Sequence, residues 1–126
     1  ANRFSPAGRG AWYAALEVET ALAEVGFHLT RALRDAGRFE AAIDWAELWA
    51  SVAGEYVDLR RIDPRPACLD PDPALGYPAG NALAEEARAA GLNGIVWPSV
   101  RRPGGTCLAA LWPHAVQSVA QGATDC

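Results

Sequence analysis

The sequence has few cysteines and histidines, and this scarcity limits the kinds of site that it can build. Its three cysteines, Cys68, Cys107 and Cys126, form no CxxC pair, and with the two histidines they show none of the spacings of a zinc site. An odd number of scattered cysteines also suggests no disulfide framework. We therefore expect no metal site and a reducing, cytoplasmic environment.

Long apolar runs and an excess of positive charge are also lacking. No window approaches the run of about 20 apolar residues that spans a bilayer, so we expect no membrane association. The net charge is -4 at pH 7, whereas broad nucleic-acid binding requires clustered Lys and Arg side chains that neutralise phosphates. We expect a soluble protein that makes no direct contact with nucleic acid.

What the chain does contain is the composition of an ordinary globular domain. It has 126 residues, of which 51% are hydrophobic and 21% are charged. This length is enough for one domain with a single core, and we assign residues 1–126 to it.

The first part of the chain predicts a strand followed by a helix. Residues 11–16, "AWYAAL", follow a segment rich in Pro and Gly, which favours a strand entered from a turn. A helix is expected to begin at Thr20, a suitable N-cap, and to end at Gly37. Apolar residues recur through it at helical spacing and predict its core-facing stripe: Leu22, Val25, Leu29, Leu33 and Ala36.

The rest of the chain predicts strands, a loop, a second helix and further strands. Residues 41–61 fit either a helix or a pair of strands broken at Gly54, and we favour the strands. Residues 64–78 hold five of the nine prolines and predict a long surface loop. The remaining predictions are a helix over 80–91, strands over 94–100 and 106–112, and a turn over 101–105. This order lacks a regular alternation of strand and helix, so we expect an α+β domain with mainly antiparallel sheets and flanking helices.

Two candidates for a binding site lie near the N-terminus. Arg3 could clamp a phosphate or a carboxylate through its planar guanidinium group, and Tyr13 could stack on a flat ring. Each also has a structural interpretation, Arg3 as a surface arginine and Tyr13 as a core tyrosine whose hydroxyl reaches water.

Glu24 is the strongest single candidate for a catalytic residue, because small apolar residues flank it on the predicted helix. A carboxylate in such surroundings could stabilise an oxocarbenium-like transition state or hold a ribose hydroxyl. Glu24, His28 and Arg31 share the helix face opposite the apolar stripe. Alternatively, Glu24 and His28 form an ordinary i,i+4 pair. We expect Glu17 and Glu19 to be exposed.

Ser99 ends a predicted strand and precedes Arg101 and Arg102. A serine hydroxyl with nearby backbone N–H groups and arginines could receive a diphosphate. The alternative is a turn serine beside solvated arginines. No GxSxG motif surrounds Ser99, so the sequence does not support a hydrolase nucleophile.

The order and spacing of these residues resemble the RES domain family, which is named for an arginine, a glutamate and a serine. The resemblance covers nearly the whole chain and rests on the segments "NRFS", "WYAALEVETALAEVGFH" and "AGLNGIVWPSVRRPGGTCLAALWP". Carried over residue by residue, it makes Arg3 the family's arginine and Tyr13 its strand tyrosine. Glu24 is then the glutamate and Ser99 the serine.

The resemblance implies a core similar to that of ADP-ribosyltransferases and a bacterial toxin that consumes NAD+ as its substrate. The bond between nicotinamide and ribose would break, and ADP-ribose would pass to water, phosphate or a protein side chain. Arg3 would hold the diphosphate, Tyr13 would stack on or orient the nicotinamide ribose, and Glu24 would stabilise the cationic transition state. Ser99 would position a phosphate or ribose group, with His28 as a partner of Glu24.

The resemblance also implies a cognate antitoxin as partner and leaves a protein acceptor of ADP-ribose and a homodimer open. Trp97 stands where the family more usually has tyrosine, and the family normally has residues before its arginine, so we expect an N-terminal segment to be missing here. The competing interpretation is a non-enzymatic module whose polar face binds a partner protein.

Overall fold

The computed structural model describes residues 2–6, 10–35, 45–52 and 54–125, and their side chains except those of 29–35, 45–52 and 117–125. Two short 3-10 helices, η1 (Ala67–Leu69) and η2 (Pro113–Ala115), join longer elements. These longer elements are β1 (Trp12–Ala15), α1 (Val18–Asp35), β2 (Trp45–Val52), β3 (Tyr56–Asp58), α2 (Pro73–Ala89), β4 (Gly94–Pro98), β5 (Thr106–Ala110) and β6 (Val116–Asp125).

Four of the strands form a central sheet in the order β1-β5-β4-β3. β5 pairs antiparallel with both β1 and β4, whereas β3 pairs parallel with β4. β2 and β6 form a separate antiparallel ribbon. The predicted α+β class with mainly antiparallel pairing is therefore confirmed.

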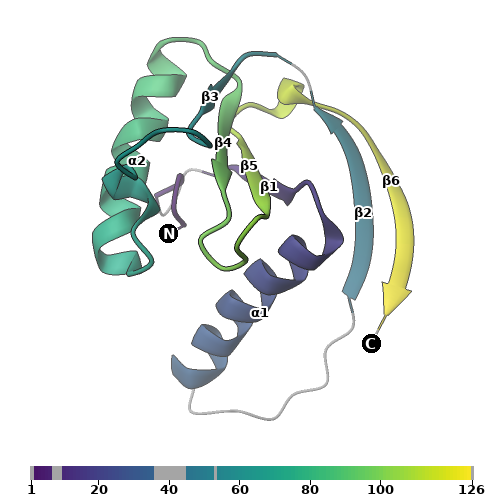
Figure 1. The fold of residues 1–126 in the computed structure, drawn as a ribbon. Helices are drawn as coiled ribbons and strands as arrows, with labels where there is room; N and C mark the ends of the chain where they lie inside the picture. Colours follow the sequence, from purple (N-terminus) through teal and green to yellow (C-terminus); the bar gives the residue numbers. More distant parts are fainter. Residues whose placement is uncertain (1, 7–9, 36–44, 53, 126) are drawn as a thin grey trace.

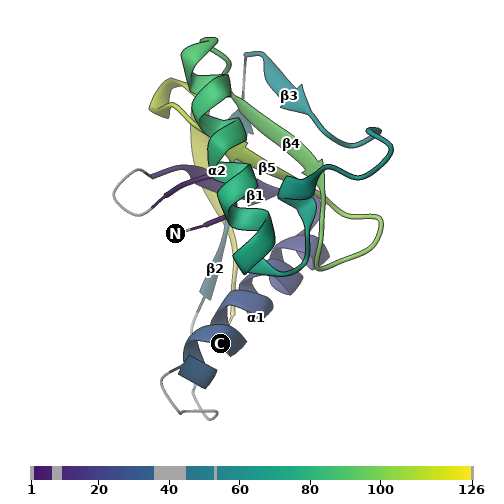
Figure 2. The same ribbon diagram turned by 90° about the vertical axis from the view of Figure 1, so that its left-hand side faces the viewer.

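Helix α2 and the β2–β6 ribbon lie on different sides of the central sheet. α2 covers one face, and the β2–β6 ribbon lies on the opposite side (Figure 1; Figure 2). Because side chains alternate between the two faces of a strand, the register places Tyr13, Trp97 and Cys107 together on the face that α2 covers. There they join the main core, which includes Phe4 and Leu69.

Most predicted strands are present with small shifts at their ends. β1, β4 and β5 lie within the segments predicted as strands. β2 and β3 confirm strands rather than a helix within residues 45–61, and between them Gly54 has a φ of 102°, which favours glycine. Residues 41–44 lie outside the described residues. β6 is an addition, because its small and polar residues give no clear alternation.

The first helix is present, but its orientation differs from the prediction. α1 begins at Val18, so Thr20 is not its N-cap but a fully buried residue of the first turn. Leu22 and Val25 are 44% and 57% exposed, so the predicted core-facing stripe is wrong where side chains are described. The helix instead turns Thr20 and Glu24 toward the β4–β5 turn, which they reach by hydrogen bonds. The other predicted positions lie outside the described residues or side chains: Leu29, Arg31, Leu33, Ala36 and Gly37.

The second helix begins inside the segment predicted as a loop. The Asp72 carboxylate accepts a hydrogen bond from the N–H group of Ala74 at 3.0 Å, and Pro73 occupies the first turn, where a missing N–H group is tolerated. Pro78 lies inside the helix. The predicted loop is therefore wrong from Pro73 onward, because this cap and the packing of the helix outweigh the cost of an interior proline.

Two glycines of α2 allow the N-terminal segment to lie against the helix. A Cβ atom on Gly80 would lie 2.0 Å from the carbonyl oxygen of Arg3, and one on Gly76 would lie 2.6 Å from Nη1 of Arg3. We expect Gly80→Ala to lower the free energy of unfolding by about 1–3 kcal/mol, because the backbone of Arg3 must move away. Urea unfolding measures this change.

The matched control is Gly26→Ala in α1, where a Cβ atom would meet nothing within 4 Å. Helix propensity predicts that this variant is as stable as the wild type or gains up to about 1 kcal/mol. A Gly80→Ala protein as stable as the wild type would show that the close contact with Arg3 is absent in solution.

Candidate active site

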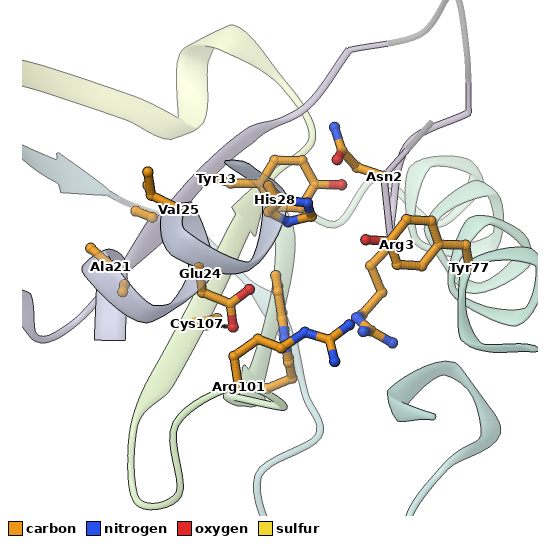
Figure 3. Close-up of a pocket in the computed structure, with 13 residues that line it drawn as sticks. Asn2, Arg3, Tyr13, Ala21, Glu24, Val25, His28, Tyr77, Arg101 and Cys107 are labelled. Atoms are coloured by element: carbon orange, nitrogen blue, oxygen red, sulfur yellow. Dashed lines mark hydrogen bonds between the residues drawn. The ribbon is translucent and has the colours of Figure 1, made fainter. Parts of the chain in front are cut away.

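A cavity of about 300 Å³ lies between α1, α2 and the central sheet (Figure 3). Five of the six predicted site residues line it, and the sixth, Ser99, is hydrogen-bonded to two of these five, Glu24 and Arg101. The structure therefore brings together residues from both ends of the sequence. The lining residues are Asn2, Arg3, Tyr13, Ala14, Ala15, Ala21, Glu24, Val25, His28, Tyr77, Trp97, Arg101 and Cys107.

Arg3 is a buried residue rather than a surface arginine. The residue is 7% exposed, and Nη1 donates hydrogen bonds to the carbonyl oxygens of Cys68 at 2.7 Å and Asp70 at 2.9 Å. The guanidinium carbon also lies 5.2 Å from the centroid of the Tyr77 ring. These contacts hold the guanidinium group at one side of the cavity.

Arg101 places a second guanidinium group in the same region. Its Nη2 donates to the carbonyl oxygen of Pro71 at 3.0 Å, and its Cζ lies 3.5 Å from the centroid of the Phe27 ring, a cation–π contact. Burial lowers the pKa of Arg3, and the nearby positive charge of Arg101 lowers it too. Two neighbouring cations held by neutral carbonyl groups favour the binding of an anion.

Tyr13 contributes its ring to the cavity and its hydroxyl to the N-terminal segment. The hydroxyl accepts a hydrogen bond from the N–H group of Phe4 at 3.0 Å and shares one with the Ser5 hydroxyl at 2.9 Å. The ring meets that of Trp97 edge to face, with 6.2 Å between centroids. Burial raises the pKa of Tyr13, so the hydroxyl stays neutral. Tyr13 thus fixes the segment that carries Arg3.

Glu24 is anchored from the sheet side of the cavity. Its Oε2 accepts a hydrogen bond from Oγ of Ser99 at 2.9 Å, and Sγ of Cys107 lies 3.5 Å from the same oxygen. Ser99 itself accepts hydrogen bonds from the N–H groups of Arg101 at 3.2 Å and Arg102 at 3.0 Å. The Ser99 hydroxyl therefore holds Glu24, whereas the sequence predicted contact with a phosphate or ribose.

Figure 3 shows the Glu24 carboxylate and the guanidinium groups of Arg3 and Arg101 directed toward the same part of the cavity. One anionic group and two cationic groups thus face a space with aromatic walls. Such a site suits a ligand that carries positive charge at one end and negative charge at the other.

Comparison with protein-family models gives a match to the RES domain over residues 1–125, essentially the whole chain. The chain belongs to the RES domain family. A comparison with curated proteins found no match. Family membership connects the chain with NAD+ at a general level and confirms the resemblance drawn from the arginine, glutamate and serine segments.

Sequence reasoning missed several residues that line this RES domain site, among them Tyr77 and Cys107. Tyr77 lies in a segment predicted as a loop, and only the observed start of α2 places its ring at the cavity. Cys107 looked like an ordinary strand residue, although its register opposite Trp97 sets it on the cavity face. His28 also lines the cavity and is exposed, and its ring centroid lies 5.3 Å from that of Phe27.

The described residues of the RES domain give no sign of two other kinds of feature. They contain no group of three or more His, Cys, Asp or Glu side chains that could hold a metal ion. None of the helices described is long and apolar enough to cross a membrane.

The side chain of Glu17 accepts hydrogen bonds within the protein instead of standing free at the surface. Its Oε1 accepts hydrogen bonds from Oγ1 of Thr20 at 2.6 Å and from the N–H group of Thr106 at 3.0 Å. Arg102 in turn donates to Oγ1 of Thr20 at 3.2 Å. The expectation that Glu17 is exposed is therefore wrong, whereas Glu19 is exposed as expected. Glu17 ties the start of α1 to the strand that follows the β4–β5 turn.

This contact predicts a pH-dependent contribution to stability. The hydrogen bonds from Thr20 and Thr106 lower the pKa of Glu17 from its ordinary value of 4.5. A lowered pKa in the folded state stabilises the fold fully above the unfolded value, and this stabilisation is lost as the pH falls through the folded value. We expect Glu17→Gln to be less stable than the wild type at pH 7 and the difference to shrink below about pH 4.5.

Thermal unfolding at pH 7 and pH 3 measures this effect, and Glu19→Gln is the control because its side chain is exposed. The control should show a much smaller difference from the wild type at pH 7. A Glu17→Gln protein that matches the wild type at both pH values would contradict the structural role of Glu17.

Proposed function

We propose that this RES domain is the toxin of a bacterial toxin–antitoxin pair. In this proposal it breaks the nicotinamide–ribose bond of NAD+ and transfers ADP-ribose to a protein, water or phosphate. The supporting observation is the anchored Glu24 carboxylate in one cavity with the guanidinium groups of Arg3 and Arg101. NAD+ carries a cationic nicotinamide ribosyl group next to an anionic diphosphate, so its charges complement those of the cavity.

The chemistry requires stabilisation of a positive charge that develops on the ribose. When the bond between C1′ and the ring nitrogen breaks, both electrons leave with nicotinamide, which becomes neutral. The ribosyl carbon then carries positive charge, and the Glu24 carboxylate stabilises it more strongly than it stabilises the ground state. A nucleophile adds to C1′ and releases a proton. Family membership and this geometry support the proposal.

The remaining cavity residues have roles in binding. Arg3 and Arg101 would hold the diphosphate, and their anchors on backbone carbonyls reduce the entropy lost on binding. The rings of Tyr13, Trp97 and Tyr77 offer surfaces for the flat nicotinamide ring. The cavity volume of about 300 Å³ lies at the lower end of small-molecule sites, which span roughly 300–1,000 Å³.

Expression in bacteria without an antitoxin tests the toxin role. We expect growth to stop while cellular NAD+ falls or a protein becomes ADP-ribosylated. Cells that express Glu24→Gln should grow normally. Labelled NAD+ identifies the acceptor, because label on a protein indicates protein transfer and label in free ADP-ribose or its phosphate ester indicates a small acceptor. Normal growth with unchanged NAD+ and no modified protein, in cells that contain the folded wild-type chain, would contradict the proposal.

A further inference from the structure

Cys107 contacts the carboxylate of Glu24 from strand β5. The residue is 3% exposed, and its Sγ lies 3.5 Å from Oε2 of Glu24. Burial, followed by the negative charge of Glu24, raises the pKa of this thiol to about 12. At neutral pH the thiol keeps its proton and can donate it in a hydrogen bond.

Ser99 binds the same oxygen atom of Glu24. Its Oγ lies 2.9 Å from Oε2, and two backbone N–H groups of the β4–β5 turn fix the position of that hydroxyl. Both hydrogen bonds that Glu24 accepts from described residues therefore end on Oε2. A carboxylate that is held through one oxygen rotates less freely, so the direction of its other oxygen is restricted as well.

We infer that Cys107 is a positioning residue, which together with Ser99 holds Oε2 of Glu24 and leaves Oε1 to face the developing ribosyl cation. This inference rests on the proposed NAD+ chemistry. A buried thiol that keeps its proton is a poor nucleophile, so the contact supports positioning rather than a covalent role. Ser99 directly follows β4 and Cys107 lies in β5, and because these two strands are neighbours in the sheet, the sheet holds both donors in place.

The kinetics of Cys107→Ala and Cys107→Ser test the inference. Loss of the donor in Cys107→Ala should lower kcat for NAD+ about three- to tenfold, because a hydrogen bond to a charged group is lost. KM should stay within about twofold, since the contact orients a group that acts in the transition state. Cys107→Ser keeps a donor at this position and should recover at least half of the loss in kcat.

Leu108→Ala is the control variant. Leu108 is the next residue of β5, is 5% exposed, and belongs to the core on the opposite face of the sheet. This variant should lose more stability than Cys107→Ala and still keep the wild-type kcat at a temperature at which it is folded. Equal losses of kcat in Leu108→Ala and Cys107→Ala would indicate a general packing effect and overturn the positioning role.

A double-mutant cycle in urea unfolding tests the contact without any need for turnover. If Sγ of Cys107 binds Glu24, the combined effect of Cys107→Ala and Glu24→Ala on the unfolding constant should differ from the product of the single effects by about threefold or more. If the effect of the double variant on the unfolding constant equals the product of the two single effects, the contact between Cys107 and Glu24 is absent.

The failure of this inference can be distinguished from the failure of the proposed function. A folded wild-type protein that releases no nicotinamide from NAD+ overturns both. An active wild type with an unchanged kcat in Cys107→Ala overturns the role of Cys107 alone.

Discussion

Glu24→Gln should lower the turnover of NAD+ by about a hundredfold or more while the affinity for NAD+ changes little. The substitution removes the negative charge that faces the developing ribosyl cation, and loss of one preorganised electrostatic contact typically costs about 10²–10³ in kcat. Because this charge acts mainly in the transition state, kcat and kcat/KM should fall together. Nicotinamide release measures turnover, and titration with NAD+ measures affinity.

The local structure predicts that Glu24→Gln remains folded. The amide oxygen of glutamine can accept the hydrogen bonds that Ser99 and Cys107 now donate to Oε2. We expect the melting temperature to stay within a few degrees of the wild type. Glu19→Gln on the exposed side of α1 is the control and should keep full turnover. Undiminished turnover in Glu24→Gln would remove Glu24 from the reaction.

Substitution of Arg3 should have the second large effect, on both binding and stability. Arg3→Ala leaves the carbonyl oxygens of Cys68 and Asp70 without their donor and removes a cation from the cavity. An unpaired buried acceptor costs about 1–3 kcal/mol, so we expect the variant to lose about 2–5 kcal/mol of stability. The dissociation constant for NAD+ should rise at least about tenfold, since a charged hydrogen bond contributes about 1.5–3 kcal/mol.

Arg3→Lys separates charge from geometry at the same position. A lysine keeps the positive charge but lacks the planar fork that can bind a carbonyl group and a phosphate together. The loss of affinity in Arg3→Lys should therefore be smaller than in Arg3→Ala. Arg60→Ala is the control, because Arg60 forms an exposed ion pair with Asp58 and should leave NAD+ affinity unchanged. Equal NAD+ affinities for the wild type and both Arg3 variants would place Arg3 outside the site.

The sequence predicted the strands better than the orientation of the first helix. Strands β1, β4 and β5 lie in segments that combine apolar and aromatic residues between turn signals. Such local patterns are enough to predict a strand. For α1, hydrophobic periodicity assumes that the most apolar face meets the core. Here Thr20 and Glu24 bond to the β4–β5 turn, while Leu22 and Val25 of the apolar stripe remain largely exposed.

The sequence also predicted which residues gather at the site, but not their bonds. The family resemblance named Arg3, Tyr13, Glu24 and Ser99, and the structure brings all four to one cavity or its wall. That the Ser99 hydroxyl donates to Glu24 depends on a contact between residues 75 positions apart in the chain. Such long-range hydrogen bonds follow from strand register and helix placement, which a single sequence does not specify.

Glu17 illustrates the same limit outside the cavity. In sequence it is one of two acidic residues next to the start of α1, and nothing separates it from Glu19. In the structure the N–H group of Thr106, 89 positions later, donates to Glu17, whereas Glu19 is exposed. The difference arises because β5 pairs with β1 and thereby brings Thr106 to the beginning of the helix.

Nicotinamide release from NAD+ by the purified, folded chain is the most direct test of the proposed chemistry. Mass spectrometry of the reaction should show free nicotinamide together with ADP-ribose, its phosphate ester or an ADP-ribosylated protein, depending on the acceptor supplied. The same incubation with Glu24→Gln should yield about a hundredfold less nicotinamide in the same time. Intact NAD+ after incubation with the folded wild-type chain and all three kinds of acceptor would contradict the enzymatic function and favour a module that only binds a partner protein.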